Sequence, residues 1–153
     1  MQALRSLQVS SGLSKETSVR YASLMHDVGR GLTNQPSGSS HPDHRALGLE
    51  LLSKITKRLC VPNEHSSLAA LVCEHRIKMQ ALDKLSADEL LSLIESLDAI
   101  RRPERFKKFM TVCEATTRAR TGLENLKYVH AKFLSQIIEI ISEVDVKALL
   151  HSR

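Results

Sequence analysis

The sequence places a histidine and an aspartate side by side, His26 and Asp27, at the end of an apolar run that begins at Tyr21. A neutral imidazole beside a carboxylate can bind one divalent metal ion, and such an ion can activate water for catalysis. Gly29 and Gly31 follow, and glycine allows the backbone to leave a helix at once. His26 and Asp27 are therefore candidates for both metal binding and catalysis, although a His-Asp dipeptide alone is a weak signal.

Helical segments must position this pair. We expect a helix from Lys15 to about Val28, capped by Ser14, that carries His26 near its end. A loop over residues 29–41 follows, rich in Gly, Ser, Asn and Pro, and loops of this length are often functional. Further helices are predicted over residues 1–12, from Pro42 to Leu59, after Pro62, after the capping box Ser86-Ala87-Asp88-Glu89, from Pro103 to about Arg120, and from about Tyr128 towards Leu150.

Apolar residues recur at helical spacing within these segments and predict the core. The expected inward residues include Leu4 and Leu7 in the first helix, Leu59 at the end of the third, and a stripe from Leu90 to Ile100. No alternating strand pattern occurs anywhere in the chain. The sequence therefore predicts an all-α fold of about six or seven helices.

The composition fits one soluble domain. The chain has 153 residues, 42% of them hydrophobic and only 3% aromatic, so aliphatic side chains must fill the core. The net charge of +5 is compatible with an anionic partner such as RNA. Cys60, Cys73 and Cys113 lie in apolar helical contexts and predict reduced core thiols of a cytoplasmic protein. We expect no membrane span and no signal peptide.

A basic segment begins after Asp98. Its cations, together with two arginines further along the same predicted helix, are Arg101, Arg102, Arg105, Lys107, Lys108, Arg118 and Arg120. Such side chains can bind the phosphates of an RNA backbone without reading its bases. The alternative is a solvated basic face whose charges pair with Asp98, Glu104 and Glu114. We treat the segment as a candidate RNA-binding site.

Five segments of the chain, in order, resemble the C-terminal half of the bacterial CCA-adding enzymes, which are tRNA nucleotidyltransferases. The matching segments are Val19–Ala22, Leu24–Thr33, Arg58–Glu64, Asp98–Phe106 and Cys113–Glu124. The resemblance implies an HD-domain-like helical bundle over residues 1–125, with a C-terminal helix over residues 126–153 packed on it or extending it. It also implies three partners: tRNA, an upstream nucleotidyltransferase domain that uses Mg²⁺, and a second copy of the chain in a homodimer.

The same resemblance implies a divalent metal site made of a histidine, the His-Asp pair and a later aspartate. In this chain the first histidine falls at Gln2, and a later His-Asp pair falls at His75-Arg76. Glutamine is a poor ligand for a transition metal, and arginine would place a fixed positive charge beside the ion.

The metal site is therefore expected to be degenerate. It would keep His26, Asp27 and His75, with His41 and His44 as further candidates in the loop and the next helix. We expect any phosphohydrolase activity to be absent or weak, because metal sites fail when the number and charge of their ligands are wrong.

Three functions stay open at this point. The first is a tRNA-positioning HD-type domain of a tRNA nucleotidyltransferase, with the nucleotide-adding site outside this chain, because no Asp-x-Asp pair follows Gly38-Ser39. The second is an active metal-dependent phosphohydrolase that acts on 2′,3′-cyclic phosphates at RNA ends. The third is a helical interaction module with no role in RNA binding.

Overall fold

The computed structural model describes residues 2–32 and 42–151, with side chains described from 2 to 30 and from 45 to 143. Its α-helices are α1 (Gln2–Leu13), α2 (Thr17–Met25), α3 (Pro42–Leu59), α4 (Asn63–Gln80), α5 (Ala87–Leu97), α6 (Pro103–Arg118) and α7 (His130–His151), and its 3₁₀ helices are η1 (Val28–Leu32) and η2 (Leu82–Lys84). No β-strand occurs within these ranges, so the predicted all-α fold is confirmed.

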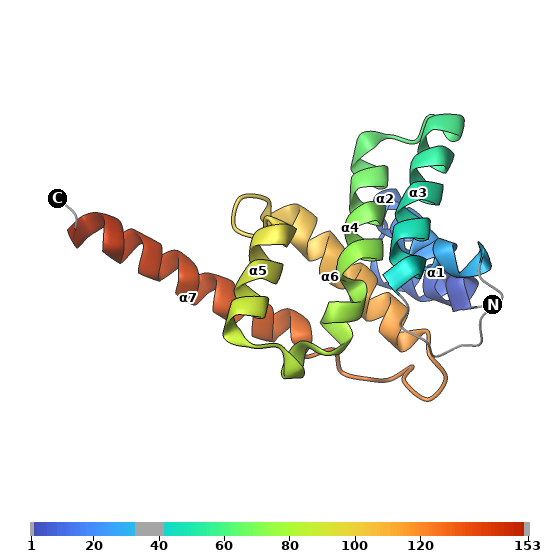
Figure 1. The fold of residues 1–153 in the computed structure, drawn as a ribbon. Coiled ribbons are helices and arrows are strands. Elements are labelled where there is room, and N and C mark those ends of the chain that lie inside the picture. The colour runs from blue at the N-terminus through green and yellow to red at the C-terminus, as the bar shows by residue number, and fades with distance from the viewer. Residues whose placement is uncertain (1, 33–41, 152–153) are drawn as a thin grey trace.

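Helices α1 to α6 form a bundle from which α7 projects. Helix α2 packs on α4 and α6, α1 packs on α2 and α6, and α3 packs on α4 and η1. Figure 1 shows α6 crossing behind α4, α5 on the opposite side of α4 from α3, and α7 extending away from the other helices. The domain boundary expected between residues 125 and 126 stays a prediction.

The core is made mostly of aliphatic side chains, together with two phenylalanines, Phe106 and Phe109. The largest fully buried side chains include Phe109, Leu68, Met79, Leu93, Ile94, Leu97 and Leu134. They come from α4, α5, α6 and α7, where apolar residues three or four positions apart lie on one face of each helix. Leu134 attaches the first turns of α7 to this core, because it belongs to the same cluster of buried residues.

Several helix ends agree with the sequence, and others differ. The Ser86 side chain accepts from the Glu89 backbone N–H, and Glu89 accepts from the Ser86 N–H, so the predicted capping box is present. Helix α2 begins only at Thr17, and Ser14 accepts from the Glu16 N–H without acting as the N-cap residue. It ends at Met25, three residues earlier than predicted, because the chain turns into η1 at Val28.

Three residues predicted to point inward are exposed. Leu4, Leu59 and Ile100 have exposed fractions of 61%, 64% and 47%. Helix α1 instead buries Ser6 and Ser10, whose small side chains allow it to approach α2 and α6 closely. Leu59 is the last residue of α3, and Ile100 lies in the turn after α5, so both side chains stand at the end of a helix and not on its inner face.

The cysteines are free thiols at three different depths. Cys113 is buried and Cys73 is half-buried, as expected for core thiols, but Cys60 is exposed. Cys60 follows α3 and has a φ of 49°, which places it in the turn rather than on the inner helix face. None of the helices within the described ranges is long and apolar enough to span a lipid bilayer.

Candidate functional site

The His-Asp pair lies at the exit of α2, as the sequence predicts. His26 is the C-cap residue of α2 in the right-handed helical conformation, and the Arg30 N–H donates to the Asp27 carbonyl at 3.0 Å. The chain then passes into η1, where Gly29 is buried. A Cβ atom on Gly48 of α3 would lie 3.6 Å from the Gly29 Cα, so two glycines allow α3 to pack directly on η1.

The imidazole of His26 is held in one tautomer. Its Nδ1 lies 2.7 Å from the Ser23 carbonyl oxygen, which can only accept, so Nδ1 carries the proton and Nε2 keeps its lone pair. His26 is 4% exposed, and Nε2 is buried without a hydrogen-bond partner among the described residues. Burial, and next the positive charge of Arg76, lower its pKa to about 4. His26 is therefore neutral at physiological pH.

The carboxylate of Asp27 is engaged by two arginines. Its Oδ1 lies 3.2 Å from the Arg30 Nε and 3.5 Å from the Arg76 Nη2. Arg76 belongs to α4, and its side chain is only 7% exposed, whereas that of Asp27 is 20% exposed. A buried guanidinium requires a negative partner, so this pair ties the exit of α2 to α4.

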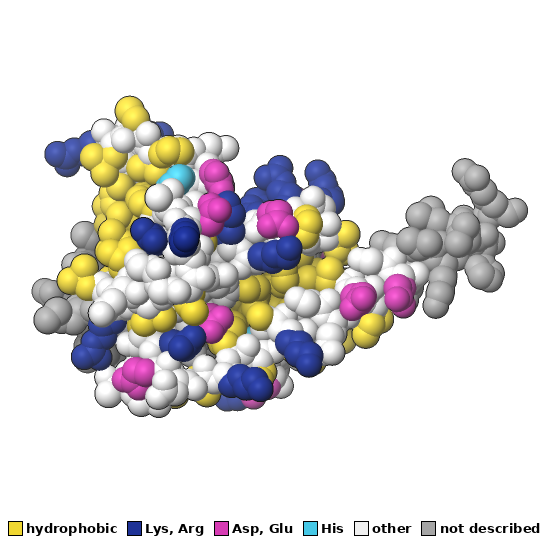
Figure 2. Space-filling view, turned by 180° about the vertical axis from the view of Figure 1, so that it is seen from behind, with side chains coloured by type: hydrophobic (Ala, Val, Ile, Leu, Met, Phe, Trp, Pro, Cys, Tyr) yellow, Lys and Arg dark blue, Asp and Glu magenta, His cyan; other side chains and the backbone are white. Residues whose placement is uncertain are grey.

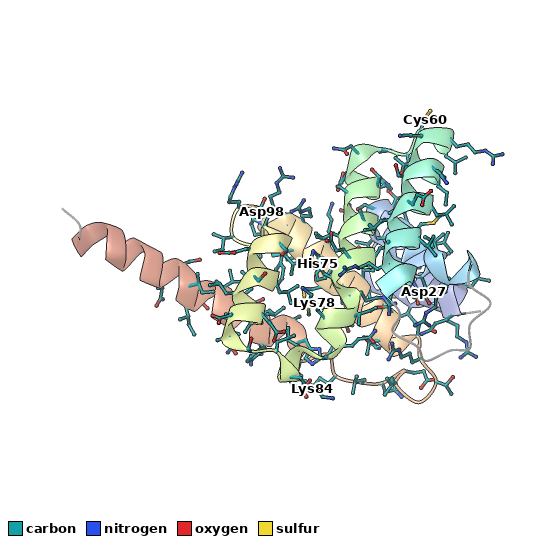
Figure 3. The ribbon with its side chains drawn as sticks, in the orientation of Figure 1. Asp27, Cys60, His75, Lys78, Lys84 and Asp98 are labelled. Carbon is teal, nitrogen blue, oxygen red and sulfur yellow. The ribbon has the colours of Figure 1, made fainter. Side chains whose placement is uncertain are left out.

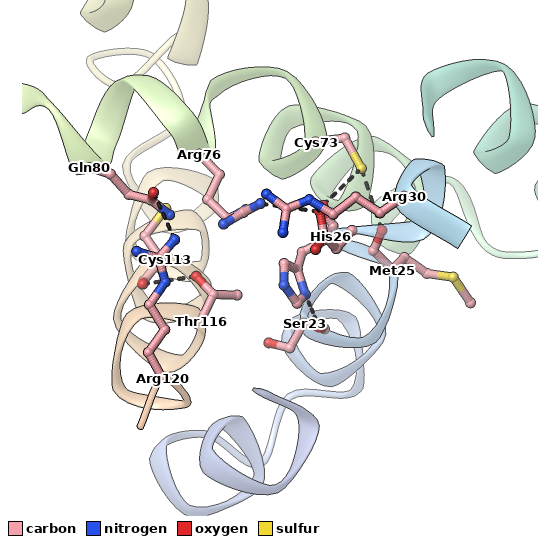
Figure 4. A network of polar contacts seen from close by, with 11 residues as sticks. Ser23, Met25, His26, Arg30, Cys73, Arg76, Gln80, Cys113, Thr116 and Arg120 are labelled. Carbon is pink, nitrogen blue, oxygen red and sulfur yellow. Dashed lines mark hydrogen bonds and ion pairs between the residues drawn. The ribbon is translucent and has the colours of Figure 1, made fainter. Parts of the chain in front are cut away.

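Figure 4 shows the polar contacts around this pair. The Cys73 thiol of α4 donates to the carbonyl oxygens of Met25 and His26, at 3.5 and 3.8 Å. Burial raises the pKa of Cys73 to about 11, which keeps the thiol protonated as this donor requires. Cys73 therefore adds a second link between α4 and the backbone on either side of the α2 exit.

His75 does not join His26 and Asp27 in a metal-binding group. Figure 3 shows His75 and Asp27 on opposite sides of the α4 ribbon in that view. The Nε2 of His75 lies 3.8 Å from the Glu74 carboxylate, and burial lowers the His75 pKa. Among the described residues, no group of three or more His, Cys, Asp or Glu side chains could hold a metal ion.

The described side chains therefore do not fit a divalent metal. They offer one buried imidazole nitrogen and one carboxylate whose charge two guanidinium groups already balance. A cation placed at Asp27 would meet the fixed charge of Arg76 at close range. His41 and the side chain of His44 lie outside the described residues, so their part in metal binding stays a prediction.

The basic segment is extensively paired with carboxylates. Asp98 is the partner of three arginines, at 3.7 Å from Arg101, 3.3 Å from Arg102 and 3.9 Å from Arg105. Lys107 pairs with Glu104, Lys108 pairs with both Glu16 and Glu64, Arg118 pairs with Glu114, and Arg120 donates to the side chain of Gln80. Figure 2 shows Lys and Arg side chains interspersed with Asp and Glu side chains over the face of the molecule that it views. The role of these cations in RNA binding stays a prediction.

Sequence reasoning did not predict the contacts that Arg30, Cys73 and Lys108 make in the structure. Arg30 lies three positions after Asp27, which is a spacing that could have suggested the pair. Lys108 gave no such signal, because its carboxylate partners lie 44 and 92 positions away in the sequence. Cys73 gave none either, because it donates to backbone carbonyls, which are present at every residue.

Comparisons with known proteins place this geometry in context. The sequence model of the HD domain family matches residues 2–102. A protein of Teredinibacter turnerae named Multifunctional CCA protein is 38% identical over 147 residues, which cover 96% of this chain and 36% of that protein. Proteins of the same name from Hahella chejuensis and Pseudomonas fluorescens are 35% and 39% identical, over 98% and 87% of this chain and 36% and 32% of their own lengths. No solved structure matches the chain. The chain spans about a third of the length of these curated relatives.

Replacing Asp27 with Asn should destabilise the fold. The variant leaves the Arg76 guanidinium buried without its negative partner. Such a loss costs about 3 to 5 kcal/mol in a fully buried pair, and we expect a smaller cost here because Asp27 is 20% exposed. Urea unfolding of both proteins would measure the change. Glu104→Gln, which breaks an exposed pair with Lys107, is the matched control and should leave stability nearly unchanged. Equal effects of the two substitutions would contradict a structural role for Asp27.

The stability of the fold should depend on the protonation of His26. Because the folded protein holds the His26 pKa near 4 and the unfolded chain near 6.5, the unfolded state binds more protons between these values. The stabilisation that neutral His26 gives to the folded state is fully present above pH 6.5 and is lost as the pH falls towards 4. Over this range the free energy of unfolding changes by up to about 1.4 kcal/mol per pH unit. The free energy of unfolding, measured with urea at several pH values between 5 and 7, should change less with pH in His26→Gln than in the wild type. The prediction fails if the two slopes are the same.

Proposed function

We propose that this chain, which belongs to the HD domain family, is the tRNA-positioning HD-type domain of a CCA-adding tRNA nucleotidyltransferase. The similarity to three proteins named Multifunctional CCA protein supports this parent enzyme. The nucleotide-adding site would lie outside these 153 residues, in an upstream domain that uses Mg²⁺ to add nucleotides to the 3′ end of tRNA. We place the enzyme in the cytoplasm, where we propose that it forms a homodimer.

The observation that carries the proposal is the state of the Asp27 carboxylate. Its Oδ1 contacts the guanidinium groups of Arg30 and Arg76, so two cations already balance the negative charge that would attract a metal ion. A metal-bound water activated for attack on a phosphate requires an intact ligand set. We therefore assign the His-Asp region a structural role within the domain, and we do not favour the alternative of an active phosphohydrolase.

The chain should not hydrolyse 2′,3′-cyclic AMP in the presence of Mg²⁺, Mn²⁺, Ni²⁺ or Co²⁺. The described ligands are too few, and Arg76 repels a cation from the Asp27 carboxylate. Release of adenosine monophosphate can be followed by chromatography, with Asp27→Ala as the matched variant. Metal-dependent turnover by the wild type that Asp27→Ala abolishes would contradict the proposal. His41 and His44 would then be the next residues to replace.

The purified chain should bind tRNA with an affinity that falls as salt rises, because phosphate contacts release counterions. Replacing Arg101, Arg102 and Arg105 together with Ala should weaken binding to all tRNAs alike and flatten the dependence on salt. Fluorescence anisotropy of labelled tRNA at several salt concentrations measures both. If the wild-type chain binds no tRNA, it is a helical interaction module and the tRNA-positioning role is wrong.

A further inference from the structure

A pocket of about 330 Å³ lies between the first turns of α4 and α6. It is lined by Asn63, Glu64, Ser67 and Leu68 of α4, by Arg102 just before α6, and by Glu104, Arg105 and Lys108 of α6. Its volume is at the lower end of the range of ligand pockets, and three of its eight lining side chains are cations. The helices it joins, α4 and α6, pack directly on each other.

The cations and the carboxylates of this pocket differ in depth. Arg105 and Lys108 are each 24% exposed, whereas Glu64 is 62% exposed and Glu104 is 77% exposed. Arg102, Arg105 and Lys108 follow one another at intervals of three residues, which keeps them on one side of the beginning of α6. Arg102 is 60% exposed, so the two deepest charged groups of the pocket, Arg105 and Lys108, are positive, while its third cation lies as near the surface as Glu64.

The backbone favours an anion at the same place. Helix α4 begins at Asn63 and α6 begins at Pro103, and neither helix has a side chain that caps its N-terminal N–H groups. A helix N-terminus carries partial positive charge and unpaired donors, which attract phosphate groups. The guanidinium of Arg105 is held beside the pocket that it lines, because its Nη2 donates to the Leu97 carbonyl oxygen at 3.1 Å.

We propose that this pocket binds a backbone phosphate of tRNA, an inference that rests on the tRNA-positioning role proposed above. The phosphate would take the place of the exposed Glu64 carboxylate as the partner of Lys108, and an exchange of this kind costs little because exposed ion pairs are weak. Arg101 and Lys107, at 81% and 70% exposure, flank the same segment without lining the pocket. A polynucleotide is long enough to contact these flanking cations as well as the pocket, whereas a single free phosphate contacts only the pocket.

The test compares two double variants of equal charge. Arg102→Ala with Lys108→Ala removes two pocket cations, and Arg101→Ala with Lys107→Ala removes two cations of the same segment outside the pocket. Binding of labelled tRNA is measured by anisotropy over a series of salt concentrations, and thermal unfolding checks that each variant is folded. Arg102→Lys with Lys108→Arg, which preserves both charges, is the rescue variant.

We expect the pocket variant to lose about ten-fold or more in affinity and to lower the salt slope by about one, while the matched control loses about three-fold or less. The rescue variant should retain most of the affinity. Equal losses in both double variants would overturn the pocket and leave the segment as a diffuse basic face. No loss in either variant, with wild-type binding intact, would overturn the pocket and locate the tRNA contact elsewhere. Absence of wild-type binding would overturn the tRNA-positioning role, and the pocket proposal with it.

Discussion

The ion pair between Arg76 and Asp27 is the constraint on which the geometry of the His-Asp region depends. Arg76 lies in the core of the bundle, so its charge must be matched from within the fold. Asp27 can meet it only because the chain leaves α2 at His26 and turns through the buried Gly29. The neutral state of His26, the position of η1 and the contact with α3 follow from that turn, since each involves residues next to Asp27.

Much of the helical framework could be predicted from local signals in the sequence. Ser86 and Glu89 form the expected capping box, and Pro42 and Pro103 start α3 and α6 where the sequence places them. These features depend on residues within one turn of each other. Local signals did not predict that Leu4 and Ile100 are exposed, because helical spacing does not reveal whether another helix lies opposite an apolar side chain.

The candidate site was harder to predict for the same reason. The sequence showed that His26 and Asp27 are adjacent and that an arginine, Arg76, stands where a metal-binding aspartate is expected. The structure adds that Arg76 pairs with the Asp27 carboxylate. The three-residue group with His75 did not form, because neighbouring residues on a helix point about 100° apart and Arg76 faces Asp27. The bridge from Lys108 to Glu16 and Glu64 joins three helical regions, and no local pattern predicts such a contact.

The two buried serines of α1 have a consequence for the dynamics of the chain. Ser6 and Ser10 let α1 lie close to its neighbours, but they bring little apolar surface out of water, and the Ser6 hydroxyl is buried without a partner among the described residues. By contrast, α6 buries Phe109, Met110 and Val112. Local unfolding requires less free energy where fewer apolar contacts are lost, so the amide hydrogens of α1 would exchange with solvent earlier than those of α6. We therefore expect the first helix to open before the rest of the bundle, although it packs on both α2 and α6.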